Sequence, residues 1–278
     1  MELLCPWESP QNLIFSSNVP SLLYYSHLVA ICAAFVFAYV LISKKSSSLS
    51  AKPLAVSLVL FIIWVAIDLL LWATNRPDIV LFYWSLQILI EMVLFASTLY
   101  LAYVFIRQKD LSINHKVLLV ILVIPIIILL PTTYLLPGID IAYCNAIESN
   151  FVIFYTYLVQ IIISFSILFL SFSEINKQNT RRKEVAFFTI GLIIFLLAFS
   201  SGNIIGSITE DWNLAQVGLF GMPIFISFLT YSTLKFKIFN LRLISSQVFV
   251  IALWLLVGSI LLINTIENVR IITSITLI

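Results

Sequence analysis

Charged residues are rare: they make up only 10% of the 278 residues of this sequence. A soluble domain has about 25%. The polar stretches are short, so the chain has no segment from which a separate soluble domain could form. These two absences exclude an ordinary cytosolic protein and give no basic surface for nucleic acid.

Glycine, histidine and cysteine are scarce as well, with seven, two and three residues respectively. There is no glycine-rich phosphate loop, no HExxH or CxxC motif and no GxSxG nucleophile motif. His115 lies in a basic loop, where a solvated side chain is the ordinary interpretation. We therefore expect no enzyme activity, cofactor or metal site within these residues.

The residues that are abundant are apolar: they make up 62% of the chain, and the mean hydropathy is +1.11. Apolar runs close to the ~20 residues that cross a bilayer recur along the whole length. Because the bilayer core offers no water, each span must be a helix. The expected spans are 21–43, 54–74, 79–106, 117–136, 151–172, 185–206, 214–234 and 243–263. Pro125, Pro131 and Pro223 are expected to kink the fourth and seventh of them.

The fold class predicted is therefore all-α, a polytopic helical membrane protein. It divides into an N-terminal segment (1–20), a seven-helix bundle (21–236) and an eighth helix with the start of a ninth (237–278). The apolar end Ile271–Ile278 is too short to cross alone, so we expect the natural chain to continue through a ninth helix.

The basic residues predict the orientation of the spans. Thirteen of the fifteen fall in the loops after odd-numbered spans, and only Arg76 and Arg270 fall on the other side. Basic loops stay in the cytoplasm. This predicts a multi-pass protein of the cell membrane with an extracytoplasmic N-terminus. The thirteen are Lys44, Lys45, Lys52, Arg107, Lys109, Lys116, Lys177, Arg181, Arg182, Lys183, Lys235, Lys237 and Arg242.

The cysteines predict a disulfide on the outer face. Cys5 and Cys144 both lie on that predicted side, where disulfides persist, whereas Cys32 lies inside the first span. A bridge would tie the N-terminal segment to the loop between the fourth and fifth spans. Two free thiols that never approach one another are the alternative, since sequence does not give their separation.

A few polar side chains interrupt the spans. Asp68 and His27 lie roughly 9 Å from the outer ends of their helices, given a rise of about 1.5 Å per residue. Glu91 lies near the midplane. A carboxylate at the centre of a membrane helix costs roughly 2.5–3.5 kcal/mol on insertion scales. The candidate ligand-binding residues are His27, Asp68, Gln87, Glu91 and Asn203.

Two interpretations of these residues are open. They form a polar cavity that faces the outside and is bordered by tryptophan and tyrosine, since Trp64, Asp68 and Trp72 are four residues apart and share one helix face. Alternatively they form hydrogen bonds between helices, each worth ~0.6 kcal/mol, that fix helix order only.

Four segments carry a resemblance to a known family. They are "SSNVPSLLYYSHLVA", "DLLLWAT", "FYWSLQILIE" and "YSTLKFKIFNLRLISSQVFVIALWLLVGSIL". They resemble the N-terminal seven-helix membrane sensor region of bacterial sensor histidine kinases. The phospho-accepting histidine and the ATP-binding domain of such kinases are not in this sequence.

This resemblance implies a signal-sensing module that binds an unknown small ligand, or responds to the bilayer, and acts on a cytoplasmic histidine kinase. It also implies a homodimer formed through the kinase region. The alternative is an ion- or proton-coupled transporter or channel that uses Asp68 and Glu91. An enzyme acting on lipids is a third class, and the missing nucleophile and metal motifs argue against it.

Overall fold

The computed structural model describes residues 5–6, 19–43, 48–177, 181–209 and 216–236. These residues are mostly helical, as predicted. The predicted eighth and ninth helices, and nearly all of the N-terminal segment, lie outside the described residues. The helices are α1 (Ser21–Ser43), α2 (Ala51–Ala73), α3 (Pro77–Arg107), α4 (Ile113–Ile121), α5 (Ile124–Leu129), α6 (Asn150–Ile175), α7 (Arg182–Thr209), the 3-10 helix η1 (Gln216–Phe220) and α9 (Gly221–Phe236).

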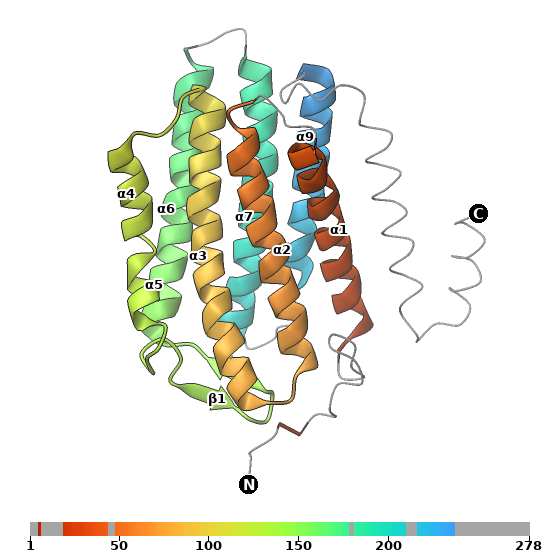
Figure 1. Cartoon of the computed structure of the whole chain (residues 1–278), viewed down its shortest axis with the longest axis vertical. Coiled ribbons are helices and arrows are strands. Elements are labelled where there is room, and N and C mark those ends of the chain that lie inside the picture. The colour runs from red at the N-terminus through yellow and green to blue at the C-terminus, as the bar shows by residue number, and fades with distance from the viewer. Residues whose placement is uncertain (1–4, 7–18, 44–47, 178–180, 210–215, 237–278) are drawn as a thin grey trace, which may run out of the picture.

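Six helices pack in chain order into a closed ring. Each of α1, α2, α3, α6, α7 and α9 contacts the next, and α9 returns to α1. Among the described helices α1, α2, α3, α6 and α7 are long and apolar enough to cross a membrane. The α4–α5 segment lies outside the ring, beside α3 and α6 (Figure 1). The described residues therefore form a ring of six helices with the broken α4–α5 segment outside it.

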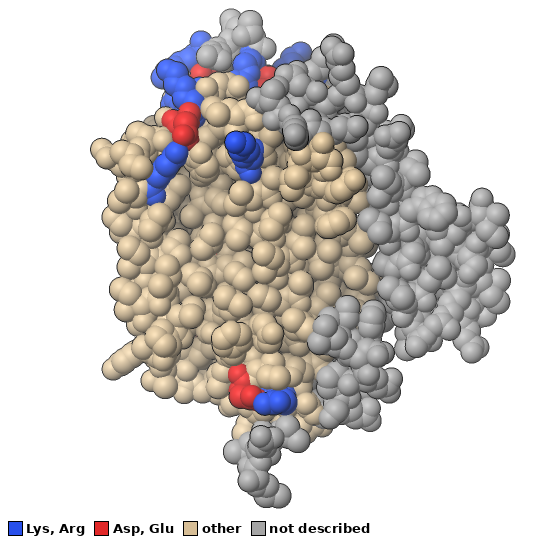
Figure 2. Space-filling model, viewed as in Figure 1, with Lys and Arg blue, Asp and Glu red and all other residues tan. Residues whose placement is uncertain are grey.

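The two ends of the ring differ in charge. Basic side chains gather where α1 ends and α2 begins, as Figure 2 shows at the top of the view. We call this the basic end; it carries Lys52, Arg107, Lys109, Lys116, Lys177, Arg181, Arg182, Lys183 and Lys235. The opposite end carries a short β-hairpin, and we call it the hairpin end (Figure 1).

The basic end is also held together by charged pairs. Asp110 accepts hydrogen bonds from Lys116 at 2.7 Å and from the Tyr100 hydroxyl at 2.8 Å, which ties the start of α4 to α3. The hydrogen bond from Lys116 is the main cause that lowers the pKa of the Asp110 carboxyl.

The predicted fourth span, 117–136, is wrong as a single helix. The structure has two short helices, with a break at Leu122 and Val123. Pro125 explains the break, because it has no N–H to donate to residue 121 and its ring crowds that carbonyl. α5 then ends at Leu129, two residues before Pro131, which has no N–H to continue the helical hydrogen bonds.

The break leaves a backbone carbonyl that a neighbouring helix satisfies. The N–H groups of Ile126 and Ile127 both bond to Val123 O, so Leu122 O loses its usual helical partner. The Tyr155 hydroxyl of α6 donates to Leu122 O at 2.8 Å. An unsatisfied carbonyl in a bilayer costs several kcal/mol, so this bond fastens the broken segment to α6.

A small sheet is an addition to the predicted all-α fold. Strands β1 (Gly138–Asp140) and β2 (Asn145–Ile147) pair antiparallel. The Asp140 carboxylate accepts from Ala142 N at 2.8 Å and so shapes the turn between them. Cys144, the residue before β2, has a left-handed backbone with φ 53°. After β2 the Ser149 side chain caps α6 by accepting from Val152 N.

The predicted seventh span also differs from expectation. It consists of η1 followed by α9, and Pro223 lies in the first turn of α9, where its missing N–H disturbs no helical hydrogen bond. Glycines allow η1 and α9 to approach α7 closely. A Cβ at Gly218 would lie 2.4 Å from Ala198 O, and one at Gly221 would lie 2.8 Å from Ala198 Cβ.

Candidate functional site

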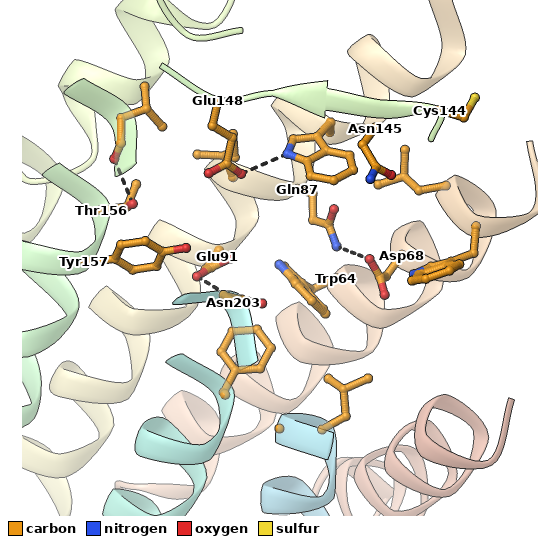
Figure 3. Close-up of a pocket in the computed structure, with 18 residues that line it drawn as sticks. Trp64, Asp68, Gln87, Glu91, Cys144, Asn145, Glu148, Thr156, Tyr157 and Asn203 are labelled. Carbon is orange, nitrogen blue, oxygen red and sulfur yellow. Dashed lines mark hydrogen bonds between the residues drawn. The ribbon is translucent and has the colours of Figure 1, made fainter. Parts of the chain in front are cut away.

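A polar cavity lies inside the ring at the hairpin end. Its volume is about 60 Å³, measured as the space open to the centre of a water molecule. Each water needs about 10–15 Å³ of such space, so roughly four to six water-sized groups fit. The cavity is lined by Trp64, Asp68, Leu71, Trp72, Trp84, Gln87, Ile88, Glu91, Cys144, Asn145, Glu148, Val152, Thr156, Tyr157, Phe199, Asn203, Gly218 and Leu219 (Figure 3).

Asp68 joins three helices on one side of the cavity. Its Oδ2 lies 2.7 Å from Nε2 of His27 on α1, and its Oδ1 accepts from Nε2 of Gln87 on α3 at 2.9 Å. His27 is completely buried, while the Asp68 side chain is 14% exposed. Asp68 therefore faces the cavity, and His27 supports it from behind.

The geometry around His27 determines how many protons the pair holds. Nδ1 lies 2.8 Å from the Leu23 carbonyl oxygen. Because a carbonyl only accepts, Nδ1 must carry a hydrogen. The 2.7 Å contact between Nε2 and Asp68 then requires one proton between these two atoms. The pair is neutral with that proton and carries one negative charge without it.

Glu91 is the centre of a second polar group. Its Oε1 accepts from Gln160 Nε2 on α6 at 2.7 Å and from Asn203 Nδ2 on α7 at 2.8 Å. The Gln160 amide is oriented in turn by Ser200, whose hydroxyl donates to Oε1 of Gln160 at 2.8 Å. The Glu91 carboxylate thus links α3, α6 and α7 while part of it borders the cavity (Figure 3).

The hairpin covers the cavity and is attached at two places. Glu148, just after β2, accepts from Trp84 Nε1 of α3 at 2.9 Å. Cys144, just before β2, forms a disulfide with Cys5, with Cα atoms 5.6 Å apart. The backbone N–H of Cys5 also donates to Asn75 O in the turn between α2 and α3. The predicted pairing of Cys5 with Cys144 is thus the one in the structure.

The Trp64 indole has a buried N–H without a hydrogen bond. Trp64 is 6% exposed, and Nε1 has no hydrogen-bond partner. The Glu91 carboxyl lies near this N–H but outside hydrogen-bond geometry. Figure 3 shows the ring nitrogen turned toward the space between Glu91 and Gln87. A buried donor of this kind costs free energy unless an acceptor reaches it.

The structure brings four of the five candidate ligand-binding residues to one cavity: Asp68, Gln87, Glu91 and Asn203 line it. His27, the fifth, does not line the cavity but bonds to Asp68. Trp64 and Trp72, which share a face with Asp68, line it as the spacing predicted.

Other lining residues were not predicted. Trp84 could have been found, because it lies three residues before Gln87 and seven before Glu91 on the same face of α3. Glu148 and Asn145 carry no such signal, because a hairpin that folds back over a helix bundle has no helical periodicity.

Below the cavity the core is filled by aromatic rings. Phe199 lies with its ring centroid 4.7 Å from that of Trp64 and 5.8 Å from that of Phe195. Farther along, the Phe105 and Phe188 rings stack at 3.8 Å, and Arg181 lies over Phe105 at the basic end. We call this set the aromatic column; it consists of Trp64, Phe61, Phe95, Phe199, Phe195, Phe225, Phe188 and Phe105.

The disulfide leads to a prediction that mass spectrometry checks. Alkylation without reduction is expected to modify Cys32 only, because Cys5 and Cys144 are bonded to each other. Alkylation after reduction in denaturant is expected to modify all three cysteines. The Cys32→Ser variant is the matched control and should take up no reagent before reduction. Three modified thiols without reduction would show that the bridge is absent.

Comparison with protein-family models, with curated proteins and with solved structures gives no match.

Proposed function

We propose that this protein is a membrane signal-sensing module that receives its stimulus in the cavity at the hairpin end. The proposal places the hairpin end outside the cell and the basic end in the cytoplasm, as the positive-inside rule requires. The signal then passes along the bundle to a cytoplasmic effector. By the sequence resemblance that effector is a histidine kinase, and the module works as a homodimer.

One observation carries this proposal: a polar cavity at one end of the ring is closed toward the other end by the aromatic column. A transporter or channel needs polar groups along a whole path across the membrane. Phe61, Phe195 and Phe199 are each at most 1% exposed and fill the centre directly below the cavity. A cavity that is closed at one end suits a site that binds a ligand, and it does not suit a path along which a solute crosses the membrane.

The aromatic column also offers a physical link between the two ends. Its rings contact one another from Trp64 at the cavity to Phe105, which lies beneath Arg181. A close-packed interior does not deform continuously, so a changed charge at the cavity can favour a second packing of these rings. Such a shift requires that the stimulus interact differently with the two packings.

Transport remains the second candidate because of one feature. The proton shared by His27 and Asp68, together with the nearby Glu91, is an arrangement that proton-coupled transporters use. Solute or proton uptake into proteoliposomes distinguishes this candidate, because the sensor mechanism needs no net flux.

The proposed function is tested by a distance measured at the basic end. Spin labels are placed at Lys109→Cys and Lys235→Cys, both exposed, in a Cys32→Ser background. Lowering the external pH from about 8 to about 5 is expected to change the label distance, because histidine is the side chain that ordinarily changes charge in this range. The change should be lost when Asp68→Asn and Glu91→Gln remove the carboxyl groups that bond to His27 and to Gln160 and Asn203.

The matched control is Asp78→Asn, which removes a carboxylate that is 65% exposed at the hairpin end, outside the cavity, and should leave the response unchanged. No response in the unmodified cavity, or an equal response in the Asp68→Asn and Glu91→Gln variant, would contradict the sensor function. A pH-driven flux of protons or solute through the protein would instead favour the transporter.

A further inference from the structure

The cavity carries an excess of acidic side chains. Asp68, Glu91 and Glu148 line it, and among the described lining residues there is no lysine or arginine. Glu91 accepts hydrogen bonds from two neutral side-chain amides, and Glu148 accepts one from the Trp84 indole. Inside a membrane such carboxylates must be neutralised by protons or by a bound cation.

The walls of the cavity favour an organic cation over a metal ion. Trp64, Trp72, Trp84, Tyr157 and Phe199 supply five aromatic rings. Aromatic faces attract ammonium groups, and the attraction grows when both partners are removed from water. In the part of the chain that the structure describes, no group of three histidine, cysteine or acidic side chains is placed to hold a metal.

The Trp64 N–H requires a hydrogen-bond acceptor on the ligand, in addition to the positive charge that the carboxylates require. This donor is buried, borders the cavity and makes no hydrogen bond. A ligand that satisfies it must present an acceptor oxygen, in addition to the positive group that the carboxylates attract. Trp64 and the Glu91 carboxyl lie near each other, so both groups belong to one short molecule.

The size of the cavity limits that molecule. Roughly four to six water-sized groups fit into its volume of about 60 Å³. A four-atom amino alcohol fits, whereas a sugar or a peptide does not fit without movement of the hairpin.

We propose that the cavity binds a small organic ammonium that carries a hydroxyl group, of the ethanolamine type, as the ligand of the sensor function proposed above. The ammonium group lies between Glu91 and Glu148 against the tryptophan rings. The hydroxyl oxygen accepts the hydrogen bond from Trp64 Nε1. An ammonium group two carbons from an acceptor oxygen has two sources: the free amino alcohol, and the ethanolamine headgroup of a phospholipid, in which the oxygen is a phosphate ester.

The test measures binding of three probes to the full chain in phosphatidylglycerol nanodiscs, by calorimetry and tryptophan fluorescence. Ethanolamine has both groups, propylamine lacks the oxygen, and ethylene glycol lacks the charge. Ethanolamine should bind in a saturable way, propylamine roughly tenfold more weakly for the loss of one hydrogen bond, and ethylene glycol at least about 100-fold more weakly.

Two variants assign these preferences to residues. Glu91→Gln should weaken both amines at least about tenfold. Trp64→Phe removes the N–H together with part of the aromatic ring, so the roughly tenfold preference for ethanolamine over propylamine should disappear. Asp110→Asn, which alters an exposed carboxylate far from the cavity in the fold, is the control and should bind like the original chain.

The outcomes separate the ligand from the function. No saturable amine binding, or ethylene glycol binding as tightly as ethanolamine, would overturn the assignment and leave protons as the neutralising charge. Amine binding without a distance change at Lys109→Cys and Lys235→Cys would contradict the sensor function but support the ligand. Adding phosphatidylethanolamine to the nanodiscs identifies the source of the ligand. If this lipid weakens the binding of free ethanolamine, the headgroup is the ligand. If it has no effect, the free amine is the ligand.

Discussion

Replacing Arg107 with methionine is expected to lower the free energy of unfolding by about 3 kcal/mol, the low end of the range for breaking a buried ion pair. Arg107 at the end of α3 pairs with Glu174 near the end of α6. The Glu174 side chain is only 9% exposed. Without Arg107 its carboxylate remains in a poorly solvated position, so the cost is mainly that of an uncompensated charge.

The chain offers a matched control for this substitution. Arg76 pairs with Asp78 at the hairpin end, where the two side chains are 50% and 65% exposed. Arg76→Met makes the same chemical change in water and should cost less than about 1 kcal/mol. Unfolding by denaturant in detergent, followed by circular dichroism, measures both variants.

A second substitution distinguishes charge from lost packing. In Arg107→Met with Glu174→Met both charges are gone, and most of the stability should return, because apolar pairs replace buried ion pairs at little cost. If the double variant is as unstable as Arg107→Met alone, the Arg107 stem rather than its charge holds α3 to α6.

The long helices could be predicted because their signal is local. A run of apolar residues as long as the bilayer core is thick must be helical, and α1, α2, α3, α6 and α7 follow from that rule. The shared face of Trp64, Asp68 and Trp72 was predicted equally well, because it depends only on the spacing of four residues along one helix.

The parts that could not be predicted depend on contacts between distant segments. Pro125 and Pro131 indicated a kink in the fourth span, but the sequence did not show that Tyr155 from another helix bonds the carbonyl of Leu122 that the break exposes. The place of Glu148 over the cavity depends on a hairpin and on Trp84, which lies 64 residues earlier. His27 was expected to line the cavity, but it bonds to Asp68 from the side away from the cavity. The sequence does not show which helix packs on the far side of α2.

We expect the cavity to open only at the hairpin end, and we expect this end to face the outside of the cell. Thr156 on α6 lines the cavity, and Thr156→Cys in a Cys32→Ser background introduces one reactive thiol there. The probe is a membrane-impermeant thiol reagent with a trimethylammonium group, whose positive charge suits the acidic lining. Lys177→Cys is the matched control, because Lys177 is exposed at the basic end, two residues after the end of α6.

Intact cells and inside-out vesicles, each treated with this reagent and analysed by mass spectrometry, give the most direct measurement. We expect Thr156→Cys to be labelled in intact cells and to remain unlabelled in inside-out vesicles, while Lys177→Cys shows the reverse. Labelling of Thr156→Cys from the cytoplasmic side would contradict this expectation, because the aromatic column would then not close the cavity or the basic end would not face the cytoplasm.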